Sequence, residues 1–287
     1  MDEKKDLKLG KIISMLRRAK SLKLREVTQG CFSESLLARF EKGESDITVE
    51  KFFVILKNSN IYLDEFQSIY NDYSMDEEEK FRTDLANAYS KRDIVKIKEI
   101  LKFWESKVQE KPSVKYFKIN ETVIRIILVM AQNSVVLKKD VDFLMNHLEQ
   151  VTEWGRYELW IFSNCLRFFD DNSLKYYGKY ILGKTNFYQS IHLNQQLVIR
   201  TFLNIIDTFL RRGDLIFALK YINYLESINI QIDFFYEKII LNYHKAHYRV
   251  LQKQKSAVND MRKCVETLEY YGYKEEAKIL YEEIENL

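Results

Sequence analysis

Residues 33–45 carry side chains whose types and spacing suit contact with the edges of DNA bases. Arginine can fork onto a guanine, serine can bond a base or a phosphate, and leucine can touch the methyl group of thymine. The four residues expected to read bases in the major groove are Glu34, Ser35, Leu36 and Arg39. The alternative is that these residues only face solvent.

A short helix must hold these side chains in place. Ser33 can cap its N-terminus, because the hydroxyl can accept a bond from a backbone N–H of the first turn. Leu37 and Phe40 lie three residues apart and form its buried face. Gly43 can end the helix at a positive φ. A helix of this length is unstable alone in water, so it needs neighbours.

The flanking segments supply those neighbours in the order of a helix-turn-helix. Leu9, Ile13 and Leu16 define the buried stripe of a first helix, and Gly30 permits the turn into the helix capped by Ser33. The other predicted helices cover about residues 7–20, 24–29 and 48–58, with a fifth beginning after the turn at residues 60–62. Five short helices in about 65 residues form a unit of domain size.

The basic residues are concentrated at the N-terminus. Residues 4–25 contain nine basic and one acidic side chain and carry a net charge of +8, whereas the whole chain carries only +3. This asymmetry favours one end that faces a polyanion, although basic residues also simply solvate helix faces. The residues expected to contact DNA phosphates are Lys11, Arg18, Lys23 and Ser33. Arg17 is expected to be structural. In the helix-turn-helix fold class, an arginine at this position commonly pairs with a glutamate at the position of Glu41.

Composition predicts an almost entirely helical protein. The 287 residues suggest about two domains, and the single proline and eight glycines are too few for a large β-architecture. Three cysteines, odd in number and far apart, together with the absence of a signal peptide, indicate reduced thiols in the cytoplasm. The longest apolar run, residues 123–131, is interrupted by Arg125 and is too short to cross a bilayer, so no membrane association is expected.

From residue 77 onward the chain repeats a unit of two amphipathic helices. The predicted pairs are 77–91 with 93–109, 113–132 with 138–153, 155–170 with 172–183, 194–212 with 214–228, and 233–252 with 255–271, followed by a last helix over 274–286. A period near 40 residues is typical of an α-solenoid, in which each pair buries its face against its neighbours. A non-repetitive helical bundle remains the alternative.

Polar side chains recur on helix faces that should line the inner side of this solenoid. Asparagine can pair with both the N–H and the C=O of an extended peptide, and arginine can hold a carboxylate. The candidate ligand-binding residues are Arg156, Trp160, Asn164, Arg167, Arg200, Asn204, Asp207 and Asn242. The alternative is that they hydrogen-bond between repeats or lie on a plain surface.

Catalytic and metal motifs are not found. His244 and His247 have the i, i+3 spacing of metal ligands, but no carboxylate-rich or cysteine cluster accompanies them. The sequence also lacks a phosphate-binding glycine loop, a nucleophile elbow and a CxxC pair. We therefore expect no enzymatic activity, no cofactor and no metal.

Several segments together resemble the Rgg/MutR family of bacterial transcriptional regulators. They are residues 9–18, 33–45 (ending in RFEKGES), 61–66 (IYLDEF), 153–159 (EWGRYEL) with Asn164, and 235–238 with 260–262. The resemblance implies a dimer with an XRE/Cro-type helix-turn-helix and a TPR-like repeat domain that binds an imported signalling peptide in quorum sensing. Lys23 departs from the family pattern, which usually has a serine N-cap there, so Ser21 is one candidate for capping the second helix.

These observations predict a sequence-specific, peptide-responsive transcriptional regulator. We expect a helix-turn-helix domain over 1–66, a linker over 67–76, and a repeat domain for peptide binding and dimerisation over 77–287. The expected partners are double-stranded promoter DNA, a short peptide, a second copy of the chain and, as a further candidate, RNA polymerase. The alternative is a regulator whose repeat domain docks a protein partner instead of a peptide.

Overall fold

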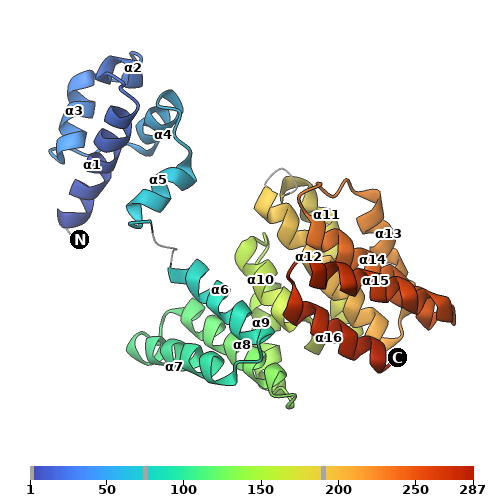
Figure 1. The fold of residues 1–287 in the computed structure, drawn as a ribbon. Coiled ribbons are helices and arrows are strands. Elements are labelled where there is room, and N and C mark those ends of the chain that lie inside the picture. The colour runs from blue at the N-terminus through green and yellow to red at the C-terminus, as the bar shows by residue number, and fades with distance from the viewer. Residues whose placement is uncertain (1–2, 74–76, 189–191) are drawn as a thin grey trace. The chain divides into compact units, whose positions relative to one another are not determined.

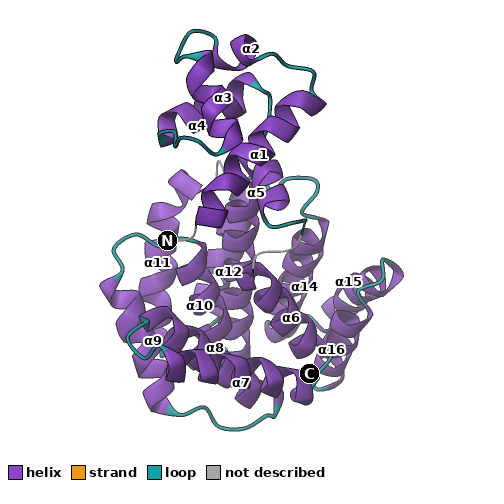
Figure 2. Cartoon of the chain, turned by 90° about the vertical axis from the view of Figure 1, so that its left-hand side faces the viewer, coloured by secondary structure: helices purple, strands orange, loops and turns teal. Residues whose placement is uncertain are grey.

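The protein is described by a computed structural model that covers residues 3–73, 77–188 and 192–287. The chain divides into two compact units, residues 1–83 and residues 84–287 (Figure 1). The described residues form helices and loops, with no β-strand among them (Figure 2). None of the described helices has both the length and the apolar character that a bilayer crossing requires.

Five helices build the N-terminal unit, as the hydrophobic spacing predicted. They are α1 (Glu3–Ala19), α2 (Leu24–Thr28), α3 (Glu34–Lys42), α4 (Val49–Asn58) and α5 (Leu63–Tyr70). The core lies where their apolar stripes meet, and Ile13, Val27, Leu37 and Ile55 are fully buried in it. Residues 67–70, which the sequence assigned to the linker, are helical because Ile69 and Tyr70 pack against this core. The last part of that predicted linker, residues 74–76, lies outside the described residues.

The predicted ends of α3 are confirmed. The Ser33 hydroxyl accepts a hydrogen bond from the Leu36 N–H at 3.2 Å, and Gly43 leaves the helix at φ +76°. Helix α2 is capped differently from our expectation. Its N-cap residue is Lys23, whose backbone N–H donates to the Glu26 carboxylate at 2.6 Å. Ser21 adopts a left-handed conformation, with φ 56°. A carboxylate at the third helical position therefore replaces the serine cap.

A nearly buried ion pair joins α1 to α3. The Arg17 guanidinium donates to both oxygens of Glu41, at 2.6 and 2.7 Å, and to the carbonyl oxygen of Leu22 at 2.7 Å. The two side chains are only 11% and 6% exposed. The hydrogen bond to Glu41 raises the pKa of Arg17 above its ordinary value, although burial opposes it. The predicted structural role of Arg17 is confirmed, because its fork is committed to protein acceptors.

Gly10 permits the same two helices to approach closely. A Cβ atom on this residue would lie 1.9 Å from the carbonyl oxygen of Phe40. No side chain can occupy that position without moving the backbone of α3. The orientation of the expected recognition helix therefore depends on a glycine in α1 as well as on the ion pair.

The second unit consists of helix pairs, and the predicted helices are recovered with small shifts at their ends. Helix α6 (Glu77–Ser90) spans the boundary between the two units. The helices that follow it are α7 (Ile94–Glu110), α8 (Lys115–Ala131), α9 (Lys138–Gln150), α10 (Arg156–Cys165), α11 (Asp171–Tyr188), α12 (His192–Arg212), α13 (Leu215–Ser227), α14 (Phe235–Leu251), α15 (Val258–Tyr270) and α16 (Lys274–Glu285). Helix α10 ends earlier than predicted and continues as a 3₁₀ turn, η1 (Leu166–Phe168). This confirms an all-α chain with a helix-turn-helix arrangement followed by a helical repeat.

The first helices of successive pairs stack on one another. Helix α10 packs against α8 and α12, and α12 packs in turn against α14. The second helices α9, α11 and α13 pack beside this stack, each against the first helix of the following pair. One side of the unit is therefore a continuous layer formed by α8, α10, α12 and α14, which we call the inner stack (Figure 2).

We expect Gly10→Ala to destabilise the N-terminal unit by about 1–3 kcal/mol, because the added methyl group overlaps the backbone of α3. Gly183→Ala is the matched control, since a Cβ there meets nothing within 4 Å and alanine favours a helix by up to about 1 kcal/mol. Urea unfolding followed by circular dichroism measures both variants. A Gly10→Ala protein as stable as the parent would contradict the close approach.

Candidate functional site

The expected base-reading residues form the exposed side of α3. Glu34, Ser35 and Arg39 are exposed and Leu36 is half-buried, while Leu37 and Phe40 point into the core. The Ser35 hydroxyl donates to the Ser33 hydroxyl at 3.1 Å, which places it beside the helix cap. This surface has the donors, acceptor and apolar group that reading of a major groove requires.

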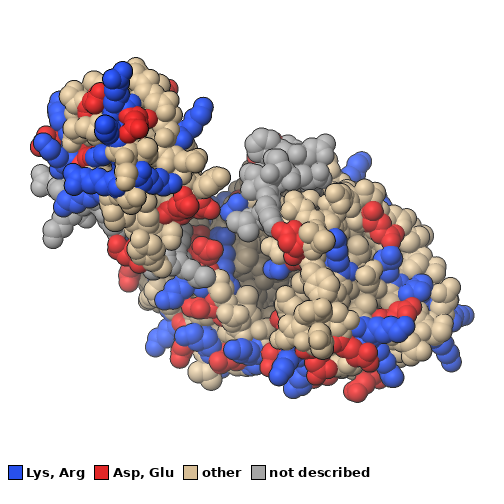
Figure 3. Space-filling model, turned by 45° about the horizontal axis from the view of Figure 1, so that its top comes forward, with Lys and Arg blue, Asp and Glu red and all other residues tan. Residues whose placement is uncertain are grey.

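Exposed cations lie on the other elements of the N-terminal unit. Lys11 and Arg18 project from α1 and Lys23 precedes α2, and all three side chains are exposed. Figure 3 shows lysine and arginine side chains on the visible face of this unit. Ser33, the fourth expected phosphate contact, is exposed but uses its hydroxyl to cap α3. These charges and the exposed face of α3 together make a candidate nucleic-acid interface.

In the repeat unit, polar pairs connect each inner helix to the next. Their members are separated by 37 to 40 residues, about one repeat period. The pairs are Tyr157 with Asn120, Arg156 with Asn194, Ser163 with Thr201, Arg167 with Asp207, Arg200 with Glu237, and Tyr243 with Glu283 of α16. Inter-repeat hydrogen bonding, left open as an alternative from the sequence, is therefore real for several of the candidate residues.

Seven of the eight predicted ligand residues lie on neighbouring faces of α10, η1 and α12. Trp160 and Asn164 are half-buried on α10, one turn apart, and the Asn164 amide donates to the Trp160 carbonyl at 2.7 Å. Arg200, Asn204 and Asp207 follow one another along α12 at helical spacing. Arg156 and Arg167 complete the face from the two ends of the α10–η1 segment. We call these seven residues the polar face. Figure 3 shows that the surface of the repeat unit is hollowed.

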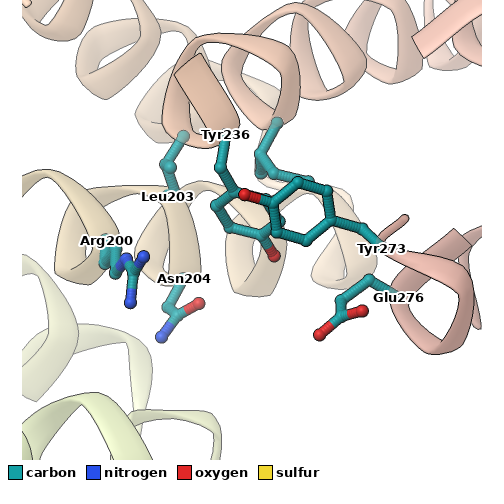
Figure 4. Close-up of a pocket in the computed structure, with 7 residues that line it drawn as sticks. Arg200, Leu203, Asn204, Tyr236, Tyr273 and Glu276 are labelled. Carbon is teal, nitrogen blue, oxygen red and sulfur yellow. The ribbon is translucent and has the colours of Figure 1, made fainter. Parts of the chain in front are cut away.

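A pocket of about 280 Å³ opens beside the polar face (Figure 4). Arg200 and Asn204 bound it from α12, together with Leu203. Tyr236 of α14 and Tyr273, just before α16, supply two aromatic walls whose ring centroids are 5.2 Å apart. The remaining lining residues are Ile240 and Glu276. The result is an apolar recess with one arginine, one amide and one carboxylate at its edge.

Arg200 is held at this edge by two contacts. Its Nε donates to Glu237 at 2.6 Å, and its guanidinium carbon lies 5.6 Å from the centre of the Tyr236 ring. Half of the Arg200 side chain (51%) is nevertheless exposed, whereas Glu237 is only 1% exposed. The buried carboxylate therefore fixes the arginine while leaving guanidinium surface available to a ligand.

Asp207, a buried member of the polar face, is the centre of an ionic cluster. It accepts hydrogen bonds from Arg167 at 3.0 Å and from Arg211 at 2.9 Å. Arg211 also reaches Glu283 of α16 at 3.0 Å. Burial alone would raise the pKa of Asp207, but His244, Arg211 and Arg167 outweigh it and hold the pKa below its usual range. Burial raises the pKa of Glu283.

The two histidines of α14 belong to the same cluster. His244 and His247 are 5% and 3% exposed, and the Nδ1 atom of each has no hydrogen-bond partner among the described residues. Burial lowers the pKa of His244 to about 4 and also lowers that of His247. No group of three or more histidine, cysteine or acidic side chains in the described parts of the chain could hold a metal ion.

Sequence reasoning did not identify part of the pocket, and one predicted ligand residue does not line it. Tyr236, Tyr273 and Glu276 were not predicted, because they come from segments that only the packing of α14 and α16 brings to α12. Asn242 was predicted, but it lies two residues, about 200° around the helix, from the pocket residue Ile240. Its side chain is exposed on the other side of α14.

Known proteins are similar to this chain over both of its units. A family model described as the C-terminal domain of the HTH-type transcriptional regulator Rgg matches residues 101–283. The crystal structure of the SHP pheromone receptor Rgg2 from Streptococcus dysgalactiae is 23% identical with a TM-score of 0.74, over 97% of this chain and 99% of that chain.

Two further solved structures have the same fold along nearly their whole length. A protein from Listeria monocytogenes EGD-e, described as a candidate transcriptional regulator, is 21% identical with a TM-score of 0.82, over 98% of this chain and 97% of that chain. PrgX in its complex with iCF10 is 17% identical with a TM-score of 0.70, over 97% and 95%.

The buried His244 predicts a loss of stability in mild acid. Its pKa of about 4 lies below the ordinary 6.5, so the unfolded chain binds the proton more readily than the folded protein. The free energy of unfolding therefore has its full value above about pH 6.5 and decreases as the pH falls towards about 4. By about pH 5 the decrease due to His244 is about 2 kcal/mol.

This loss is measured as the difference between urea unfolding free energies at about pH 7 and about pH 5. His244→Gln should remove the part of this pH dependence that His244 contributes, because glutamine does not titrate. The pKa of His247 is also lowered by burial, so His247 contributes in both proteins. The charged groups that face the His244 imidazole, Asp207 and Arg211, also remain in both proteins. Equal pH dependence in the two proteins would show that another group causes the loss.

Proposed function

The chain belongs to the family of Rgg transcriptional regulators, as the resemblance predicted, and from this premise we propose that it is a dimeric DNA-binding regulator controlled by a short peptide. The observation that carries the proposal is the polar face on α10 and α12 with its adjacent aromatic pocket. Rgg2 is described as a pheromone receptor, and PrgX forms a complex with iCF10. Both have the same fold as this chain.

The peptide would lie along the polar face in an extended conformation. Asn204 is exposed in the middle of that face, and its amide can donate to a peptide carbonyl and accept from a peptide N–H. The exposed part of Arg200 can bind a carboxylate. One large apolar side chain would enter the recess of about 280 Å³ between Tyr236 and Tyr273. Backbone contacts supply affinity in this arrangement, and the pocket supplies selectivity.

The ionic cluster offers a route from the peptide to the C-terminal helix. Asp207 lies one helical turn beyond Asn204, and Arg211 connects it to Glu283 of α16. A peptide that binds Asn204 and Arg200 more tightly in one packing of α12 against α14 and α16 would shift the population towards that packing. In a dimer, such a shift would change how two recognition helices are presented to half-sites about one turn of DNA, ~34 Å, apart.

For DNA binding, the support is the exposed face of α3 and the way the unit holds it. The Arg17–Glu41 pair and Gly10 fix α3 against α1, while Arg39 remains exposed on the outer side. Arg39 would fork onto a guanine, and Lys11, Arg18 and Lys23 would position the unit on phosphates.

We expect Arg39→Ala to weaken specific DNA binding by about tenfold to a hundredfold, because a bidentate contact to guanine is lost. The operator is first selected from random duplexes with the parent protein, and affinities are then measured by fluorescence anisotropy. Arg39→Lys should keep non-specific binding but lose discrimination at one base pair, since lysine cannot fork.

The control for lost charge is Lys57→Ala, which removes an exposed cation from α4. It should leave discrimination between sequences unchanged. An Arg39→Ala protein that selects the same operator with parental affinity would remove Arg39 from the reading surface.

We expect Asn204→Ala to reduce binding of short peptides by about tenfold, because a buried peptide amide would lose its partner. The test incubates the full-length protein with a library of random short peptides and identifies retained peptides by mass spectrometry. Asn223→Ala is the matched control, an exposed asparagine on α13. Equal retention by both variants, or none by the parent, would contradict peptide binding on the polar face.

A further inference from the structure

The recess beside the polar face has a carboxylate without a partner at its edge. Glu276 lines the recess from the first turn of α16 and is half-buried. It forms no hydrogen bond or ion pair with the residues that the structure describes. Acidic residues stabilise the first turn of a helix, but Glu275 supplies such a charge from the same turn, exposed and outside the recess. Glu276 is therefore available to a cationic group of a ligand.

The charges on the two sides of the recess are balanced differently. Figure 4 shows Glu276 on one side and Arg200 with Asn204 on the other. The charge of Arg200 is offset by Glu237 at 2.6 Å, whereas Glu276 has no such counter-ion among the described residues. Burial, and after it the charge of Glu276, raises the pKa of the Tyr236 hydroxyl to about 12, while Arg200 opposes the shift. Both charged groups therefore act on the ring between them, and the carboxylate is the one that a ligand can still neutralise.

The groups that would meet a ligand here are accessible. The side chain of Arg200 is 51% exposed, Tyr273 is 38% exposed, and Asn204 is exposed as well. Tyr236 and Glu276 are half-buried. The recess therefore offers apolar surface and a carboxylate side by side, with an amide opposite.

The N-terminal residue of a peptide carries both groups that this arrangement fits. Its ammonium nitrogen and its side chain leave the same Cα, and the N–Cα bond is only about 1.5 Å long. One residue can therefore place an apolar side chain in the recess and its ammonium against the carboxylate. A lysine carries its ammonium at the end of a four-carbon stem, so the same residue has no separate apolar side chain to offer.

We propose that Glu276 binds the N-terminal ammonium of the peptide, while the first side chain, which is apolar, occupies the recess between Tyr236 and Tyr273. Asn204 then pairs with the first peptide group, and the chain continues across α12 towards Asn164 of α10. The ammonium and the carboxylate form a charge-assisted hydrogen bond. This inference rests on the proposed peptide binding and adds a direction to it, because the N-terminus lies at α16 and the C-terminus points towards α10.

The test uses one library of random short peptides without lysine, arginine or histidine, prepared in two forms. The forms differ only at the N-terminus, which is a free amine in one and N-acetylated in the other. The full-length protein is incubated with each form, and retained peptides are identified by mass spectrometry. We expect the free-amine form to be retained about tenfold better, with apolar first residues enriched, because acetylation removes a charged hydrogen-bond partner.

The outcomes separate this inference from peptide binding itself. Equal retention of the two forms would overturn the N-terminal assignment while peptide binding stands. Retention of neither form would contradict peptide binding, and this inference with it.

A second pair of libraries, which contains lysine, distinguishes the two sources of an ammonium group. Acetylated peptides that carry lysine should be retained no better than acetylated peptides without it. If they are selectively retained by the parent protein and this selectivity is lost in Glu276→Gln, the carboxylate binds a lysine side chain and the N-terminal assignment is wrong.

Two variants locate the effect on the protein. Glu276→Gln should lower retention of the free-amine form by about tenfold and leave the acetylated form unchanged, because glutamine keeps the shape and loses the charge. Glu275→Gln is the matched control, since it removes the same charge from the exposed neighbour in the same turn. It should keep the preference for the free amine. An unchanged preference in Glu276→Gln, or an equal loss in both variants, would overturn the proposal.

Discussion

The hydrogen bonds between successive inner helices are the constraint on which the repeat unit depends. Each joins residues 37 to 40 positions apart, so each helix of the inner stack is placed relative to the next by at least one polar pair. Apolar packing alone tolerates sliding of one helix along another, whereas a buried carboxylate left without its partner is costly. Glu237 and Asp207 are buried carboxylates of this kind. They fix the register of α12 against α14 and η1.

This constraint also explains why structural residues and the residues proposed to contact a ligand occur on the same helix face. A polar side chain that reaches the neighbouring inner helix must leave α12 on the open side of the stack. Arg200 does so and remains half-exposed after pairing with Glu237, and Asn204 one turn later is exposed in the pocket. The two readings that the sequence left open, inter-repeat bonding and ligand contact, are therefore compatible for Arg200.

Sequence was most informative where one short segment determines the structure. The cap at Ser33, the stop at Gly43 and the burial of Leu37 and Phe40 all follow from residues of one short segment, residues 33–43. The aromatic walls of the pocket beside the polar face could not be predicted in this way, because Tyr236 and Tyr273 meet only after α14 and α16 pack together. For a related reason the sequence did not show that Asn242 lies outside this pocket. Its residue type suited a peptide, but only the packing of α14 determines which face turns inward.

The two units differ in how their helices are held together, and this difference bears on where a signal can act. In the N-terminal unit, Arg17 spends its fork on Glu41 and Leu22, and Gly10 leaves no space between α1 and α3. Such a unit moves as one body. In the repeat unit, the Nδ1 atom of His244 makes no hydrogen bond to the described residues, and that of His247 lies 3.7 Å from Glu283, within the cluster that joins α12, α14 and α16. A packing with unsatisfied buried groups has less to lose by rearranging. We therefore expect a signal to alter the packing of these three helices while α3 keeps its place within the N-terminal unit.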